Sequence, residues 1–412
     1  MKILHTSDWH LGRSLYHYKR YEEFEMFLNW LSKTIESEKI DILLVAGDIF
    51  DTGMPSNQAQ KLYYSFLCRI ANSSCCNHVV ITAGNHDSPT FLTAPEHILN
   101  ALNVHVIGVL PDSIKDEVLL LDNKDQTEQI IVCAVPYLRE RDIRTSEAGE
   151  NIDDKNKKVV EGIKNHYAEV CRIAEEKRVK LKLKKSTPIV AMGHLFAVGG
   201  KTVDNDGVRE MYVGTLAHIS KDVFPKNIDY MALGHLHVPQ KVKDCDYMRY
   251  CGSPLPIGFG EAKQDKKVCL IEFSEGKRVV NEISVPVFRK LEQLSGNLEE
   301  ILSRLKTLKL EEANTLLEIE YCGDEIAGNL RTSLDDAVVD TKMEILRIKN
   351  QRIVEKILNN DVVEDSLDDL TENEIFERCL DVYEVPNSQR GSLIATYKEI
   401  LMVVHEDDKN AE

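Results

Sequence analysis

The sequence predicts a layered α/β fold, and three observations support this prediction. Residues 42–46 form an apolar run that is too short for a stable helix, rich in branched side chains and followed by Gly47, as in a strand buried on both faces. The same design, an apolar strand followed by a cluster of Asp, Asn or His, recurs at four other places. Helical patterns separate these strands, which is typical of layered α/β architecture. The five strands are predicted at residues 2–5, 42–46, 78–82, 188–192 and 230–233.

The chain between these strands continues the alternation. Apolar residues at helical spacing predict amphipathic helices over residues 21–37 and 56–71, and a long charged helix is predicted over 154–176. Further strands are predicted over 104–107, 117–121 and 130–135. Residues 177–185 carry several Lys and Arg side chains, for which a nucleic-acid contact is one interpretation and a solvated connection is the favoured one.

Beyond residue 238 the pattern becomes antiparallel in character, with short strands at 247–251 and 268–273, so a first domain is expected over residues 1–282. A small α+β domain follows over 283–350, with strands at 283–288, 315–321 and 343–348 and helices at 298–308 and 329–338. Residues 351–371 are predicted to be an acidic linker. Two amphipathic helices within 372–412 carry apolar stripes, which suit a partner's groove or docking on their own domain.

Composition limits the functional classes. The net charge of −17 argues against a protein that coats nucleic acid by bulk attraction, so a DNA contact would be local or assisted by a partner. Ten cysteines lack a disulfide or zinc spacing and are expected to be reduced. The sequence offers neither a signal peptide nor an apolar stretch able to cross a bilayer, which predicts a cytoplasmic protein with no membrane partner.

The polar clusters predict a metal centre. One cluster alone would more often cap a turn, but five at the carboxyl ends of strands meet on one rim of the sheet. Carboxylates, an amide and imidazoles suit Mn²⁺, Fe²⁺ or Zn²⁺, and such a large set suits two ions that share one carboxylate, with Asp48 the best candidate for the bridge. Two metal ions bound side by side neutralise the charge of a phosphoester and generate a hydroxide from water near neutral pH. The candidate residues are Asp8, His10, Asp48, Asn85, His86, His194, His235 and His237. His86 could be a further ligand or the general acid for the leaving oxygen.

These motifs resemble those of the calcineurin-like metallophosphoesterases. The first motif is more specific and reads His5-Thr6-Ser7-Asp8-Trp9-His10-Leu11-Gly12. It resembles the motif of the DNA double-strand-break-repair nucleases and, among them, that of the SbcD family, the nuclease subunits of bacterial SbcCD complexes. The resemblance covers nearly the full length, and it implies a layered β-sandwich flanked by helices. The other motifs are Gly47-Asp48-Ile49-Phe50-Asp51, Gly84-Asn85-His86-Asp87, Gly193-His194, Gly234-His235-Leu236-His237 and Tyr250-Cys251-Gly252-Ser253-Pro254.

The resemblance implies roles for individual residues. One metal would be held by Asp8, His10, Asp48 and His237, and the other by Asp48, Asn85, His194 and His235. His86 matches the catalytic histidine. Asp51 matches an acid that hydrogen-bonds this histidine in related phosphatases, although some nucleases have a histidine there. Such a partner would raise the pKa of His86 and favour its protonated form.

The resemblance also implies cofactors and partners. Two Mn²⁺ ions are expected, with Mg²⁺ less effective, and duplex DNA ends and hairpins are the expected substrates. Residues 283–350 would be a capping domain beside the DNA, and the helices within 372–412 would grip the coiled coil of SbcC, an ATPase of the structural-maintenance (SMC) type. Helices 21–37 and 56–71 match the dimerisation region, which implies a homodimer within a heterotetramer, but internal packing would suit the same helix faces.

Three functions compete at this stage. The leading hypothesis is an ATP-regulated, manganese-dependent exonuclease and endonuclease that processes DNA ends in repair, replication and recombination. A stand-alone phosphodiesterase for a small nucleotide would share every metal ligand, but the extra domain and the closing helices disfavour it. A nonenzymatic scaffold is disfavoured because it would not need a complete ligand set.

Overall fold

The computed structural model describes residues 1–144, 151–196, 223–243, 245–274, 276–323 and 330–350, with 376–377, 380, 390–391, 393–394 and 396–398. The chain divides into two compact units, Met1–Phe288 and Arg289–Glu412. The predicted linker 351–371 and most of the predicted helices within 372–412 lie outside the described residues. In the part of the chain that is described, none of the helices combines the length and the apolar character needed to cross a membrane.

The first sheet of the N-terminal unit has the strand order β14-β13-β1-β4-β5-β6. Its strands are β1 (Lys2–Thr6), β4 (Ile42–Ala46), β5 (His78–Thr82), β6 (Val104–Ile107), β13 (Lys267–Ser274) and β14 (Lys277–Ser284). Strands β1, β4, β5 and β6 run parallel to one another, and β13 pairs with β1 in the antiparallel direction. All five side chains of β4 are buried, as the apolar run predicts.

The second sheet has the order β11-β12-β10-β9-β8-β7. Its strands are β7 (Val118–Asp122), β8 (Gln129–Ala134), β9 (Ile189–His194), β10 (Tyr230–Gly234), β11 (Gln240–Val242) and β12 (Cys245–Tyr250). The prediction of antiparallel character beyond residue 238 is wrong for one pairing, because β12 runs parallel to β10 and antiparallel only to β11.

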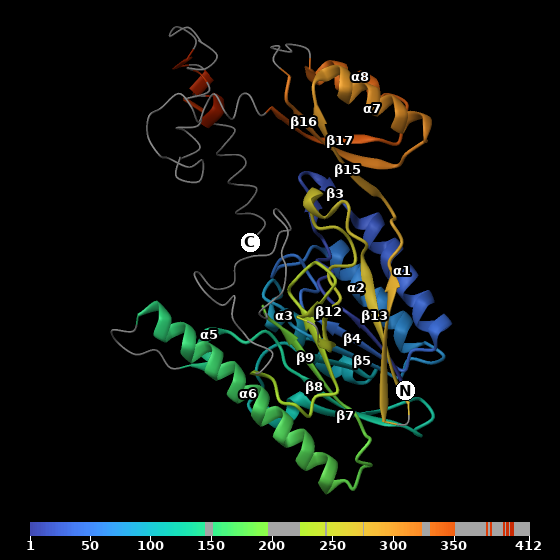
Figure 1. Ribbon diagram of the computed structural model, residues 1–412, viewed down its shortest axis with the longest axis vertical. Coiled ribbons are helices and arrows are strands. Elements are labelled where there is room, and N and C mark those ends of the chain that lie inside the picture. The colour runs from blue at the N-terminus through green and yellow to red at the C-terminus, as the bar shows by residue number, and fades with distance from the viewer. Residues whose placement is uncertain are drawn as a thin grey trace. The chain divides into compact units, whose positions relative to one another are not determined.

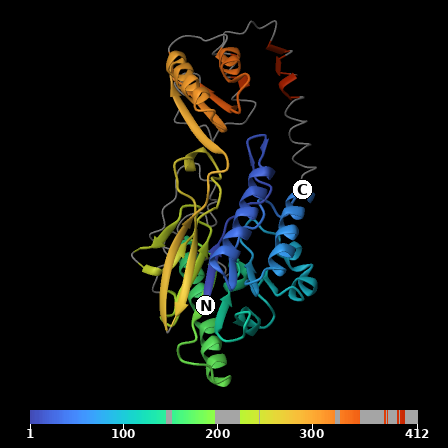
Figure 2. The ribbon, with the colours of Figure 1, turned by 90° about the vertical axis from the view of Figure 1, so that its right-hand side faces the viewer.

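The two sheets pack face to face, and helices cover their outer faces (Figures 1 and 2). Ile42 and Leu44 of the first sheet share an apolar core with Val190 and Ala232 of the second. Helices α1 (Tyr21–Glu38) and α2 (Asn57–Ala71) pack on the first sheet, and α6 (Ile152–Lys180) packs on the second. The predicted layered β-sandwich flanked by helices is confirmed. Its carboxyl strand ends face one rim, where the polar clusters follow.

Short elements between the main ones were not predicted, because none is long enough to show a period. They are β2 (Ser14–Leu15), β3 (Tyr18–Lys19), α3 (Pro89–Thr93), α4 (Glu96–Asn100), η1 (Ile114–Glu117), α5 (Glu140–Ile143) and η3 (Phe259–Glu261).

The C-terminal unit contains a parallel three-stranded sheet with two helices. The elements are β15 (Lys290–Gly296), α7 (Leu298–Leu310), β16 (Thr315–Tyr321), α8 (Leu330–Val338) and β17 (Glu344–Asn350), with the strand order β15-β16-β17. A capping box between Asn297 and Glu300 starts α7. The strand predicted at 283–288 is wrong: β14 ends at Ser284, Pro286 cannot donate to a ladder, and β15 begins at Lys290.

Candidate metal centre

The carboxyl ends of strands from both sheets bring the predicted ligands together. Asp8 and His10 follow β1, Asp48 follows β4, Asn85 and His86 follow β5, His194 ends β9, and His235 and His237 follow β10. All of them are buried except Asn85, which is half-buried. Polar groups that are hidden from water require partners, so this concentration indicates a functional site.

Asp8, His10 and His237 offer ligand atoms that lie within 4.8 Å of one another. The Nε2 atoms of His10 and His237 are 3.2 Å apart. Two imidazole nitrogens at this distance, beside a buried carboxylate, form a donor set suited to a divalent cation.

Asp48 lies between this group and a second one. Its Oδ2 atom is 3.6 Å from Nε2 of His10 and 3.3 Å from Nε2 of His194. Oδ1 of Asn85 is 3.0 Å from the same His194 nitrogen. Asp48 also forms ligand groups with Asp8 and His194 and with His10 and His86. Its position agrees with that of a shared ligand.

His235 differs from the other histidines. Its main-chain N–H donates to Oδ1 of Asp8 at 2.9 Å, and its ring centroid lies 5.4 Å from that of His194. Among the described residues, none of the three-residue ligand groups includes it. The structure therefore places His235 beside the predicted second ion without bringing its ring nitrogen into a ligand group.

Polar contacts behind three of these rings, one of them a hydrogen bond, orient the other ring nitrogen of each toward the centre of the site. Nδ1 of His194 donates to the carbonyl oxygen of Ala46 at 3.0 Å, so Nε2 is the nitrogen that can bind a cation once its proton has left. Nδ1 of His237 faces the carboxylate of Glu261 at 3.3 Å, and Nδ1 of His10 faces Asp51 at 3.3 Å. Metal-binding histidines are oriented in this way. The residues present therefore fit a cation site.

Several of these residues have unusual backbone conformations. Asp8, His10 and Asp48 have φ of 51°, 46° and 51°, and His235 has φ of 102°. Residues other than glycine rarely adopt backbone angles in this left-handed region. At Gly234 the chain approaches β4 so closely that a Cβ atom would lie 1.8 Å from the Ala46 carbonyl oxygen. The ligands thus lie on tightly folded turns where the two sheets meet.

His86 contacts Asp51, but not in the predicted way. Nδ1 of His86 donates to the main-chain carbonyl oxygen of Asp51 at 2.8 Å. The Asp51 carboxylate instead accepts from Arg13 at 3.1 Å and lies beside His10. The predicted contact through the carboxylate is therefore corrected to one through the main chain, because Arg13 and His10 draw the acid toward the loop after β1. The main-chain N–H of His86 donates to Oδ1 of Asp48 at 2.9 Å.

The charges of this site are strongly coupled. Burial alone would raise the pKa of Asp48, but the charges of His194 and His10 and a hydrogen bond from His194 hold it well below its ordinary value. Burial would lower the pKa of His194, yet Asp48 raises it to about 9. A cation would take the place of this imidazolium proton, so metal binding would release protons.

Sequence reasoning missed residues that support the ligands. The carboxylate of Asp87 accepts from the main-chain N–H groups of Gly84 at 2.8 Å, Ile49 at 3.1 Å and Phe50 at 3.0 Å, and so joins the loops after β4 and β5. Asp87 directly follows Asn85 and His86 in the same motif, and this position in the sequence could have identified it as a supporting residue.

Glu261 and Lys266 were also missed, and they form a buried ion pair. Burial alone would raise the pKa of Glu261, but the hydrogen bond from His237 and the charge of Lys266 hold it below its ordinary value, so this group is a carboxylate. Glu261 ends the short 3-10 helix η3 and Lys266 lies in the loop before β13, and neither segment is long enough to show a period that would mark these residues.

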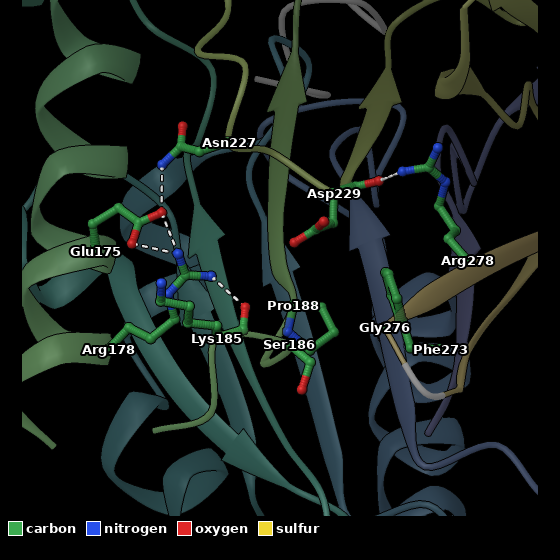
Figure 3. A pocket seen from close by; sticks show the side chains of 10 residues that line it. All are labelled: Glu175, Arg178, Lys185, Ser186, Pro188, Asn227, Asp229, Phe273, Gly276 and Arg278. Carbon is green, nitrogen blue, oxygen red and sulfur yellow. Dashed lines mark hydrogen bonds and ion pairs between the residues drawn. The ribbon is translucent and has the colours of Figure 1, made fainter. Parts of the chain in front are cut away.

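A separate pocket of about 420 Å³ lies at the opposite ends of the strands (Figure 3). Both of its arginines have protein partners: Arg178 pairs with Glu175, and Arg278 donates to the carbonyl oxygen of Asp229. Lys185 lines the same pocket at the end of the predicted basic run. This pocket does not contain the predicted ligands and is distinct from the candidate metal centre.

Known proteins resemble both parts of the chain. Residues 1–239 match the family model of the calcineurin-like phosphoesterases, and residues 287–383 match that of the type 5 capsule protein repressor C-terminal domain. The SbcD subunit of the nuclease SbcCD from Escherichia coli K12 is 35% identical over 400 residues, which cover 95% of this chain and 96% of that protein. The SbcD subunits from Rhodobacter capsulatus and Bacillus subtilis are 34% and 32% identical, covering 75% and 67% of this chain and 76% and 67% of theirs.

Proposed function

The chain belongs to the SbcD nucleases of the calcineurin-like phosphoesterase family and is a metal-dependent phosphodiesterase, and we propose that it is the manganese-dependent nuclease subunit of an SbcCD complex. Its activities would be exonuclease cleavage at duplex ends and endonuclease cleavage of single strands and hairpins, and a DNA substrate would place the enzyme at the nucleoid. The observation that carries the proposal is the gathering of buried carboxylates and imidazoles where the carboxyl ends of both sheets meet.

Two divalent cations would neutralise the phosphodiester and activate a water molecule for attack. Asp8, His10, Asp48 and His237 would hold the first ion, supported by the 3.2 Å separation between the His10 and His237 nitrogens. Asp48, Asn85, His194 and His235 would hold the second, supported by the short contacts of His194 with Asn85 and Asp48. Oxygen and imidazole donors without a thiolate agree with manganese.

His86 would protonate the leaving oxygen. Its Nδ1 must carry a proton, because the Asp51 carbonyl oxygen that it contacts can only accept. Nε2 is then the atom whose proton can move. The hydrogen bond from the main-chain N–H of His86 to Oδ1 of Asp48 holds this residue close to the carboxylate that both ions would share. Asp51 would act through its main-chain oxygen, by orienting the ring.

The remaining segments would supply substrate and partner contacts. Residues 283–350 are proposed as the capping domain beside DNA, and the helices within 372–412 as the contact with an SbcC-like ATPase. Because the chain has a net charge of −17, that ATPase would contribute the positive surface that duplex DNA requires. Helices α1 and α2 are proposed to form the dimer contact within a heterotetramer.

A nuclease assay of the purified chain tests this function. The chain, with and without its ATPase partner, is incubated with a DNA hairpin, a blunt duplex and a small phosphodiester, in Mn²⁺ or in Mg²⁺. Manganese-dependent hairpin cleavage that the partner and ATP extend to duplex ends is expected. Cleavage of the small phosphodiester alone, without any effect of the partner, would favour a stand-alone phosphodiesterase instead.

A further inference from the structure

Glu261 and Lys266 form a buried ion pair next to His237 of the candidate metal centre. Glu261 is fully buried, and Lys266 is 5% exposed. The Lys266 ammonium donates to Oε2 of Glu261. A buried ion pair adds little net stability, because desolvating both charges costs about as much as their attraction returns. The location of this pair beside a proposed ligand therefore points to a role in the site.

The pair holds His237 at two points. Oε1 of Glu261 lies 3.3 Å from Nδ1 of the imidazole. Nζ of Lys266 donates to the main-chain carbonyl oxygen of His237 at 3.1 Å. Because a carboxylate can only accept, its position beside Nδ1 favours the tautomer that carries the ring proton on this nitrogen. Nε2 then keeps its lone pair, and it is this atom that faces His10.

Other contacts hold the pair itself in place. Oε2 of Glu261 also accepts from the main-chain N–H of Ile257 at 3.0 Å and from the Ser253 hydroxyl at 3.3 Å, while Oε1 is directed at His237. Lys266 makes further bonds with Ser253 at 3.0 Å and Gln264 at 3.1 Å. Neither charged group can swing away without breaking several hydrogen bonds. The carboxylate is therefore a rigid support for the ring.

We propose that Glu261 and Lys266 are positioning residues that set the tautomer and orientation of His237 for a divalent cation. This inference rests on the proposed function, because it takes His237 as a ligand. The carboxylate also makes the imidazole a stronger donor, and loss of such a partner lowers metal affinity about 10- to 100-fold. Lys266 offsets the charge of Glu261 and ties the main chain of His237 to the same support.

The test compares Glu261→Gln, Glu261→Ala and Lys266→Met with a matched control, Glu117→Gln. Glu117 is likewise a fully buried glutamate that contacts a histidine, with Oε2 2.8 Å from Nε2 of His166, but that histidine is not a proposed ligand. Titration calorimetry measures Mn²⁺ binding to the full-length, chelator-treated chain. A thermal melt without metal and ¹⁵N NMR of labelled histidine report the fold and the His237 tautomer.

One of the two Mn²⁺ sites should weaken about 10- to 100-fold in both Glu261 variants, while Glu117→Gln keeps both affinities. Glu261→Ala should also give a mixture of His237 tautomers without metal. Lys266→Met should weaken the same site and lower the melting temperature, because it leaves a buried charge unpaired.

Unchanged Mn²⁺ affinities and a single His237 tautomer in the folded Glu261 variants would overturn the inference but not the proposed function. Equal losses in Glu261→Gln and Glu117→Gln would also overturn it, because they would reflect general destabilisation. If the unmodified chain bound no Mn²⁺, the proposed function and this inference would both fall.

Discussion

A Cβ atom on Gly84 would lie 2.1 Å from Oδ1 of Asp48 and 2.4 Å from its main-chain nitrogen. The loop after β5 thus passes the proposed shared ligand with no room for a side chain. The same Asp48 oxygen accepts the main-chain N–H of His86. Gly84 therefore allows Asn85 and His86 to approach the carboxylate that both proposed ions would share.

Gly84→Ala should reduce Mn²⁺ affinity at least 10-fold and nuclease activity with it, because the new methyl group displaces either Asp48 or the loop. Gly53→Ala is the matched control, since its Cβ atom would meet Ser88 at an ordinary 3.7 Å. Calorimetric Mn²⁺ titration and a hairpin assay of both variants provide the measurement. Equal behaviour of the two variants would show that the close approach to Asp48 has no effect on the site.

Asp48→Ala should abolish binding of both ions and all hydrolysis. Without the shared carboxylate, no anion between the two cations offsets their repulsion. Anomalous scattering from crystals grown in Mn²⁺ counts the ions directly. A fully occupied two-ion site in this variant would rule out the assignment of Asp48.

His86→Ala should keep metal content and DNA affinity but lose turnover by about 10²- to 10⁴-fold, the usual size of general acid catalysis. An aryl phosphodiester has a good leaving group that needs little protonation, so its hydrolysis should fall much less. Turnover of both substrates and metal content are measured on the same preparation. Equal losses on both substrates together with loss of metal would instead make His86 a ligand.

His5 predicts a dependence of stability on pH. This side chain is fully buried and bonds the Tyr230 hydroxyl at 2.9 Å, and burial lowers its pKa from 6.5 to about 3. The unfolded chain then binds a proton more readily than the folded chain, so this contribution to stability is complete above pH 6.5 and is lost as the pH falls toward 3. Between pH 6.5 and 5 the loss should be about 2 kcal/mol.

Urea denaturation of metal-free protein at pH 7, 6 and 5 measures this dependence. His5→Gln retains a polar group for Tyr230 but does not titrate, so its free energy of unfolding should fall less over the same range. Identical slopes in the two proteins would mean that His5 takes up no proton on unfolding.

Deletion of residues 372–412 should leave a folded, metal-binding chain that retains manganese-dependent activity on single strands. It should abolish binding to the coiled-coil ATPase and the effect of ATP on duplex ends, because the proposed contact lies in this segment. Within the segment, the rings of Phe376 and Tyr397 stack with centroids 3.9 Å apart. Pull-down and a thermal melt separate the two effects, and an unfolded product would place these helices in the core.

The strands, and the gathering of the proposed ligands at their ends, could be predicted because their signals are local. The run Ile42–Ala46 is fully buried, and Asp48, a proposed ligand, follows it two positions later. Parallel strands then bring distant segments to one rim, so residues as far apart as His10 and His237 could be placed together without knowledge of their contacts.

Features that depend on packing could not be predicted. None of the side chains of strand β14 is buried, so its apolar signal is weak, and it forms because β13 lies beside it. The direction of the Asp51 carboxylate depends on Arg13, whose position no motif specifies. Glu261 acts on His237 through tertiary contact alone, so its role emerged only from the folded chain.

The left-handed backbone at Asp8, His10 and Asp48 lowers the stability of the folded chain at three of the proposed ligands. Glycine adopts this conformation without steric strain, whereas other residues are strained by about 1–3 kcal/mol each. Selection for thermal survival alone would therefore favour replacing these three residues with glycine. Such selection would discard the proposed ligands early, so a heat-resistant variant of this nuclease has to gain its stability elsewhere.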